Sequence, residues 1–146
     1  MELKELIKES TIKLELESRD KDSVLNEMIK LLVDDKVVTN IKKFKKDILA
    51  RESLSNTGIG FGIAIPHAKS KAVKEARIAI GLTKKGVNYG SIDGQDVKMV
   101  FMIAVNDEQS DLHLRALANL SRKLMHEEFR ESILNAKSKK EIIDIL

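Results

Sequence analysis

Short segments with apolar residues in alternation or in unbroken runs predict β-strands. Residues 12–17 alternate apolar with charged positions, which is the period of a half-buried strand. Residues 63–65, 77–83 and 97–105 predict further strands, and the last is apolar at nearly every position, as in a central strand covered on both faces. We expect the short strand to stop at Pro66, because proline cannot extend a sheet ladder.

Longer segments with apolar residues every three or four positions predict helices. Asp20 or Asp22 is expected to cap a helix with five apolar side chains on one side: Val24, Leu25, Met28, Leu31 and Leu32. Four more helices are expected over about residues 39–52, 110–125, 127–136 and 141–146. A capping-box pattern, Ser138-Lys-Lys-Glu141, precedes the last of them. The glycine-rich residues 55–62 predict a turn or bent strand, and residues 86–94 predict a loop.

This mixture of strands and helices predicts an α/β fold, a three-layer α/β/α sandwich with a central mixed β-sheet. The length of 146 residues suits a single domain over residues 1–146. The N-terminal ten residues are charged throughout, and no segment approaches the roughly 20 apolar residues of a membrane span. The expectation is a cytoplasmic protein without direct membrane insertion.

The charge and cysteine content exclude several kinds of site. The net charge of +3 is a mild bias, and Lys42, Lys43, Lys45 and Lys46 interleave with Ile41, Phe44 and Ile48 at helical spacing. That spacing turns the lysines toward water, so we expect a solvated face and no nucleic-acid partner. With no cysteine and no close spacing among the three histidines, no metal site or cofactor is expected.

The sharpest candidate for chemistry is His67, which follows the only proline of the chain. We expect Pro66 to turn the backbone in a defined way and to place His67 just past a strand end. A neutral imidazole is a competent nucleophile near pH 7. The alternative is a loop histidine with one structural hydrogen bond.

Two other residues strengthen the case for an anionic substrate. His113 falls on the apolar face of its predicted helix, in the first turn, where free N–H groups and the helix dipole favour an anion. Arg51 ends the helix before the glycine-rich segment, and its planar, permanently charged fork suits phosphate oxygens. The alternatives are a core histidine bonded to a carbonyl, and an arginine that pairs with Glu52 or favours the helix C-terminus.

Several motifs together resemble the fructose/mannitol-type IIA domains of the phosphotransferase system. The first is Arg51-Glu52, followed by Ser55-Asn-Thr57-Gly58-Ile-Gly60 and Gly62-Ile-Ala-Ile-Pro-His67. The match continues through Asp93-Gly94, the apolar residues 99–105 and the segment from His113 to Leu120. It covers essentially the whole chain, and Ala68 and residues 120–124 look closer to the fructose type than to the mannitol type.

The resemblance implies a phosphocarrier. Its phosphorylated histidine maps onto His67, its second active-site histidine onto His113 and its arginine onto Arg51, while Thr57 and Glu52 match positions that would stabilise the phosphate. The implied donor is phosphorylated HPr. The implied acceptor is a cysteine of a IIB component, expected on a separate chain because this one has no cysteine. The IIC membrane permease would be an indirect partner, and no ATP or metal is required.

A regulatory role remains open from the sequence, because nitrogen-type IIA proteins use the same histidine. Such a protein would bind a kinase, channel or transcription regulator according to its phosphorylation state. A third interpretation, a small nucleic-acid binder, rests on the modest basicity alone.

Overall fold

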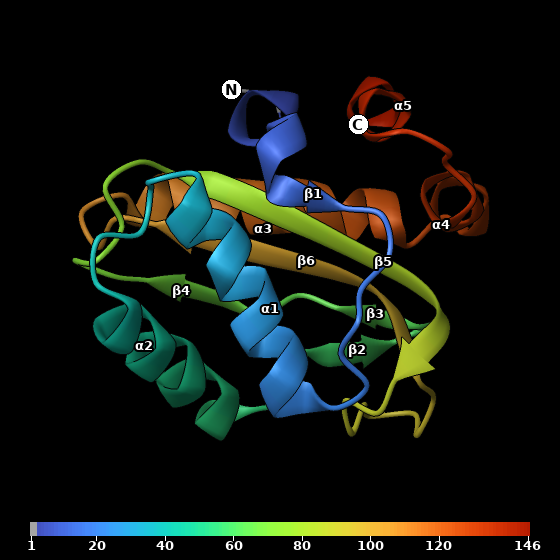
Figure 1. Ribbon diagram of the computed structural model, residues 1–146, viewed down its shortest axis with the longest axis horizontal. Coiled ribbons are helices and arrows are strands. Elements are labelled where there is room, and N and C mark those ends of the chain that lie inside the picture. The colour runs from blue at the N-terminus through green and yellow to red at the C-terminus, as the bar shows by residue number, and fades with distance from the viewer. Residues whose placement is uncertain (1–2) are drawn as a thin grey trace.

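A six-stranded mixed sheet forms the middle layer of the computed structural model, which describes residues 3–146 (Figure 1). The strands are β1 (Ile12–Lys13), β2 (Gly58–Gly60), β3 (Ile63–Ala64), β4 (His67–Lys69), β5 (Arg77–Val87) and β6 (Val97–Val105). Their order is β1-β5-β6-β3-β2, and β4 also pairs with β6. The β5–β6 pair is antiparallel, whereas β3 and β4 run parallel to β6. The predicted α/β sandwich with a mixed sheet is confirmed.

Helices cover both faces of this sheet (Figure 1). The α-helices are α1 (Lys21–Asp34), α2 (Ile41–Leu54), α3 (Ser110–Leu124), α4 (Glu127–Leu134) and α5 (Lys139–Ile145), and two short 3₁₀ helices, η1 (Leu3–Leu6) and η2 (Glu9–Thr11), precede β1. Side chains of α1 and α2 form one apolar core with one face of the sheet. Side chains of η1, α3, α4 and α5 form a second core with the other face. The sheet is therefore buried between two layers.

The helix ends follow local side-chain chemistry. Asp20 caps α1 by accepting from the Ser23 amide at 2.9 Å, as one of the two predicted caps. Asn40 caps α2 in the same way through Lys43, so α2 begins slightly later than predicted. Ser138 accepts from the Glu141 amide at 3.1 Å and thereby starts α5. Each cap satisfies a backbone N–H that the first turn leaves free.

The first strand stops before Pro66 as predicted, since β3 ends at Ala64, but the position of His67 differs from the prediction. β4 pairs with β6 in the same register as β3, so that Ile63 lies opposite Met99 and His67 opposite Ile103. Pro66 has no N–H to donate, but its carbonyl still accepts from the Ile103 amide at 3.0 Å. Pairing therefore resumes at once, and His67 is the first residue of a strand rather than a turn residue past a strand end.

Two other strands differ in length from the prediction. β1 ends at Lys13, although the Leu16 amide still donates to the Leu82 carbonyl of β5 at 2.7 Å. The following amides, those of Glu17 and Ser18, donate to the Glu27 carboxylate. β5 continues to Val87 because the pairing with β6 passes a bulge in which Gly86 has a φ of +85°.

The lysines of α2 do not form a continuous basic stripe. Lys42, Lys43 and Lys46 are exposed, and Lys45 is half-buried. Lys43 pairs with Asp47 at 2.9 Å, and Lys45 pairs with Asp22 at 3.2 Å. Ile41 was expected on the buried face with Phe44 and Ile48, but it is 54% exposed because it is the first residue of the helix and lies beyond the core.

Among residues 3–146, no helix combines the length and the apolar character that crossing a membrane requires.

The close approach of α1 to β5 depends on Gly81. A Cβ atom at this position would lie 2.6 Å from Leu16 Cδ2 and 2.7 Å from Met28 Sδ. We predict that Gly81→Ala lowers the free energy of unfolding by about 1–3 kcal/mol, because both neighbours are fully buried and must shift. Lys84→Ala, at an exposed position of the same strand, should change it by less than about 0.5 kcal/mol. Denaturant unfolding measures both, and an unchanged midpoint for Gly81→Ala would contradict the packing described.

Candidate functional site

His67 begins β4 and lies opposite Ile103, near the carboxyl end of the neighbouring parallel strand β6. Its side chain is 8% exposed. Ala64 and Ala68 belong to the core under α1 and α2, whereas Ile63 and Ile65 belong to the core under α3. The α3 helix follows β6 after a short loop, which brings its first turn to the same edge of the sheet.

Both ring nitrogens of His67 are engaged, and the two contacts require the same tautomer. Nδ1 lies 2.7 Å from the Ile65 carbonyl oxygen, which can only accept, so Nδ1 carries the proton and donates it. Nε2 accepts from the Nε–H of Arg51 at 3.1 Å and is therefore unprotonated. Burial above all lowers the pKa of His67, and the charge of Arg51 acts in the same direction, although the bond to Ile65 opposes the shift. The lone pair of Nε2 is thus present at neutral pH.

Arg51 reaches His67 from the last turn of α2. Its Nη1 donates to the Ser55 carbonyl at 3.0 Å, so the guanidinium is held at both ends. This position also places a positive charge at the C-terminus of the helix. The alternative ion pair with Glu52 is not formed within the described part of the chain, because the Glu52 carboxylate contacts Lys21, Thr57 and Tyr89.

His113 faces His67 from the first turn of α3. The ring centroids are 5.1 Å apart and the ring planes are at 83°. The side chain is 6% exposed, and its Nδ1 is buried without a hydrogen-bond partner in residues 3–146. Burial, followed by the charges of His67, Lys69 and Arg51, lowers the pKa of His113 to about 4. A neutral ring with an unbonded nitrogen therefore adjoins the His67 ring.

These three residues line an open depression of about 400 Å³. Its walls are formed by Asp47, Ala50, Arg51, Leu54, His67, Ala68, Lys69 and His113. Two larger depressions, of about 670 and 590 Å³, lie along α4 and α5 and contain neither His67 nor Arg51. We therefore take the smaller one as the candidate site, since reactive groups converge only there among the three.

Asp47 and Lys69 belong to this depression and were missed in the sequence. Asp47 precedes Arg51 by four residues on α2, and Lys69 follows His67 by two residues on β4, so both spacings put the pairs on one face. These two spacings can be interpreted only once the helix and the strand have been assigned. The unpredicted strand β4 concealed the second pair.

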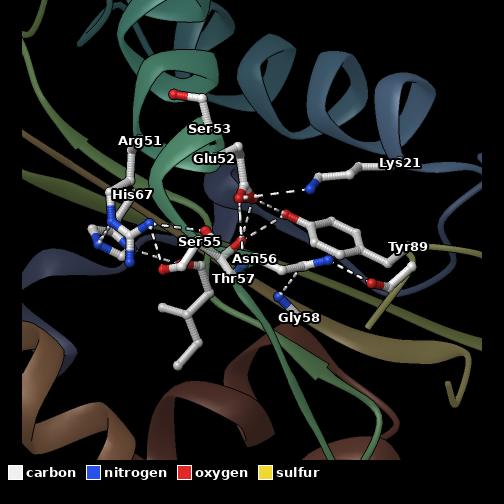
Figure 2. Close-up of polar contacts among 12 residues, drawn as sticks. Lys21, Arg51, Glu52, Ser53, Ser55, Asn56, Thr57, Gly58, His67 and Tyr89 are labelled. Atoms are coloured by element: carbon white, nitrogen blue, oxygen red, sulfur yellow. Dashed lines mark hydrogen bonds and ion pairs between the residues drawn. The ribbon is translucent and has the colours of Figure 1, made fainter. Parts of the chain in front are cut away.

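Glu52 and Thr57 do not line the depression. Their side chains bind each other and the Tyr89 hydroxyl, behind the segment that joins α2 to β2 (Figure 2). Tyr89 is the only tyrosine of the chain and lies in the loop that follows β5. No pattern in the sequence connects it with Glu52. A direct contact of Glu52 or Thr57 with a phosphate bound at His67 is therefore not what the geometry favours.

The arrangement suits an anionic electrophile. An unprotonated imidazole nitrogen supplies the lone pair, and a permanent cation lies within hydrogen-bond distance of it. Two uncharged rings and a helix N-terminus add dipoles, and Asp47, the one carboxylate that lines the depression, pairs with Lys43. Transfer of a phosphoryl group needs mainly such positioning and charge stabilisation.

Comparison with known proteins finds a matching family and similar structures. Residues 5–146 match the family described as "Phosphoenolpyruvate-dependent sugar phosphotransferase system, EIIA 2". A protein of Bacillus subtilis named "PTS system fructose-specific EIIABC component" is 47% identical over all 146 residues of the chain. This chain spans 23% of the length of that relative.

Two solved structures share the fold. The nitrogen regulatory protein IIA-Ntr of Neisseria meningitidis has a TM-score of 0.90 and 30% identity, with 98% of this chain and 97% of that chain covered. The complex of enzyme IIAMTL and phosphorylated enzyme IIBMTL from Escherichia coli has a TM-score of 0.80 and 22% identity, with 96% and 97% covered.

The lowered pKa of His113 makes stability depend on acid pH. In the unfolded chain this histidine binds a proton near pH 6.5, whereas in the folded protein it does so near pH 4. The unfolded state binds more protons between these values, so stability is lost as the pH falls through this window. We predict that, when the pH falls from 7 to 4.5, the free energy of unfolding decreases by about 2 kcal/mol less in His113→Leu than in the wild type.

Urea unfolding at the two pH values measures this difference. His126→Leu, at an exposed position, is the control and should keep the wild-type pH dependence. An equal loss of stability in His113→Leu and the wild type would show that His113 is not held neutral by its surroundings.

Proposed function

The chain belongs to the EIIA 2 family of the phosphoenolpyruvate-dependent sugar phosphotransferase system, and from this premise we propose that it carries a phosphoryl group on His67. The observation that carries the proposal is the unprotonated Nε2 of His67 beside the Arg51 guanidinium, in an open depression. The route runs from phosphorylated HPr to His67, and from His67 to a cysteine of a IIB component.

The reaction at His67 is an in-line displacement. The lone pair of Nε2 forms a new P–N bond while the P–N bond of the donor phosphohistidine breaks, and that electron pair stays on the donor ring. The proton on Nδ1 remains in its bond with the Ile65 carbonyl throughout. In the second step a thiolate attacks the same phosphorus, and Nε2 regains its lone pair. The charge is balanced without ATP or a metal ion.

Arg51 has two positions in this cycle. In the free protein the Nε–H of Arg51 is hydrogen-bonded to the lone pair of His67 Nε2. This hydrogen bond must break before Nε2 can attack the phosphorus. The guanidinium then turns its N–H groups to the phosphoryl oxygens, while the contact with the Ser55 carbonyl keeps it close. The free Nδ1 of His113 supplies a further polar contact to the same group, as a donor in the tautomer that carries its proton there.

The acceptor cysteine lies outside these 146 residues, because they contain none. The structure of Escherichia coli IIAMTL in complex with phosphorylated IIBMTL supports a IIB partner of the same kind. The fructose-specific name of the Bacillus subtilis relative supports a fructose-type sugar, which a IIC permease transports across the membrane. The proposed place of action is the cytoplasm.

A regulatory function is the second candidate, favoured by the likeness to nitrogen regulatory protein IIA-Ntr over nearly the whole chain. In that case the phosphorylation state of His67 would control binding to another protein. Phosphoryl transfer to a fructose-type IIB component distinguishes the two. The regulatory function would be favoured if no phosphoryl transfer to IIB occurs and if another protein binds this chain with an affinity that changes when His67 is phosphorylated.

We predict that His67→Ala abolishes phosphorylation of the protein. Incubation with phosphoenolpyruvate, Enzyme I and HPr should add one phosphate to the wild type, and the product should be acid-labile and alkali-stable. His126→Ala, which removes an exposed histidine far along the chain, is the control and should be labelled like the wild type. Undiminished labelling of folded His67→Ala would refute the assignment.

We also predict that Arg51→Ala lowers the rate of phosphoryl uptake by about 100-fold, because it removes the cation that stabilises the charge in the transition state. Arg51→Lys should recover part of the rate, since a lysine keeps the charge and loses the planar fork. Rapid-quench measurements give the rates, and circular dichroism checks folding. Wild-type kinetics in folded Arg51→Ala would contradict this role.

A further inference from the structure

A buried carboxylate, Glu52, lies beside the candidate site and takes no part in the chemistry described so far. Its side chain is 6% exposed. It accepts the Thr57 amide at 3.3 Å, the Thr57 hydroxyl and the Tyr89 hydroxyl at 2.6 Å (Figure 2). The two hydroxyl oxygens are themselves 2.8 Å apart. A buried charge with this many donors is specifically held.

Lys21 and Tyr89 complete the surroundings of this carboxylate. The Lys21 Nζ lies 3.8 Å from Glu52 Oε2 and 4.8 Å from the centre of the Tyr89 ring, so one cation contacts both. Burial, and then the hydrogen bond with Glu52, raises the pKa of Tyr89, which keeps the phenol protonated as a donor. Glu52 therefore accepts from the Tyr89 hydroxyl and from Thr57, and Lys21 adds a positive charge at ion-pair distance.

Backbone hydrogen bonds connect this cluster with His67. The Thr57 carbonyl accepts the Ile65 amide at 2.9 Å. The Ile65 carbonyl in turn accepts Nδ1–H of His67 at 2.7 Å. Glu52 holds Thr57 in place, and the position of Thr57 in turn fixes Ile65. The Ile65 carbonyl bonds Nδ1 of His67, the nitrogen whose proton sets the tautomer.

A second path reaches the other ring nitrogen. Glu52 follows Arg51 directly on the last turn of α2, and Arg51 donates to Nε2 of His67. The hydrogen bonds and the chain therefore close a ring that passes through Glu52, Thr57, Ile65, His67 and Arg51. Both nitrogens of the imidazole belong to it, so a displacement of Glu52 acts on both.

Other contacts also hold the segment that leaves α2, but most of them come from loops and strands. Asn56 bonds the Gly58 amide at 2.7 Å and the Gly90 carbonyl, which ties it to the loop after β5. A Cβ at Gly58 would lie 2.9 Å from Tyr89 Cδ1, so the segment fits tightly against that ring. Glu52 supplies the only contacts to the Thr57 amide and hydroxyl from a helix within the described residues.

We propose that Glu52 is a positioning residue, which acts through Thr57 and Ile65 to hold His67 in the tautomer that keeps the lone pair on Nε2 and in the orientation that directs it to Arg51. This inference rests on the proposed phosphocarrier function. It replaces a direct contact of Glu52 or Thr57 with the phosphate, since both point into the Tyr89 cluster.

Glu52→Gln tests the proposal with little change in shape. A glutamine has one acceptor oxygen, and its NH₂ group must face one of the donors that the carboxylate now accepts. We expect the maximal rate of phosphoryl uptake from phosphorylated HPr to fall about tenfold, with KM changed by less than about twofold, because the nucleophile is misplaced and the docking surface is not. We also expect ¹⁵N NMR of the His67 ring to change from one tautomer to a mixture.

Glu27→Gln is the matched control. Glu27 is also a mostly buried carboxylate that holds a loop, through the Glu17 and Ser18 amides at 3.0 Å each, and it pairs with Lys13 at 2.7 Å. No hydrogen bond in the described residues leads from it to His67. It should lose stability like Glu52→Gln, yet keep the wild-type maximal rate and the single His67 tautomer.

Three results would separate the possibilities. A folded Glu52→Gln with wild-type rate and unchanged His67 ring shifts would overturn the positioning role. If Glu52→Gln does not fold, Thr57→Val decides by the same two readouts, because it removes the hydroxyl and keeps the shape. We expect an approximately threefold slower maximal rate and a mixture of His67 tautomers. Wild-type values of both would overturn the positioning role. A wild type that cannot be phosphorylated refutes the phosphocarrier function instead, while the ring shifts still report on positioning.

Discussion

The chemistry of this protein depends on two hydrogen bonds to one imidazole. The Ile65 carbonyl takes the proton of Nδ1, and the Arg51 guanidinium requires a lone pair on Nε2. Either bond alone would favour one tautomer, and together they leave His67, which lines the depression, with a single unprotonated nitrogen. Burial keeps the ring uncharged, so the nucleophile is ready without a separate base. The same burial keeps His113 neutral across a gap of 5.1 Å between ring centres.

The fold supplies this geometry through an interrupted strand. Pro66 removes one amide from the ladder but keeps its carbonyl bonded to Ile103, so β4 follows β3 along β6 without a change of register. The carbonyl of Ile65, just before the proline, accepts the ring proton of His67. Arg51 comes from a helix of one outer layer and His113 from a helix of the other. The site thus needs all three layers in place.

Much of this could be predicted from the sequence, and the failures have physical causes. The apolar run of β6 and the periodic helices were clear because their patterns are local. The strand β4 was missed because Pro66 was expected to end the strand before it, and no resumption of pairing was expected although the Pro66 carbonyl still accepts the Ile103 amide. The cluster of Glu52, Thr57 and Tyr89 joins residues up to 37 positions apart, and no local pattern records such a contact. The prediction that Glu52 and Thr57 stabilise the phosphate therefore rested on the resemblance alone.

The central claim, that Nε2 of His67 is the reactive nitrogen, is tested most directly by NMR of the phosphorylated protein with ¹⁵N-labelled histidine. Coupling between phosphorus and the ring nitrogen identifies the atom that carries the phosphoryl group. The account predicts coupling to Nε2 of His67, with Nδ1 still protonated and bonded to Ile65. A phosphoryl group on Nδ1 of His67, or on any other residue, would contradict it.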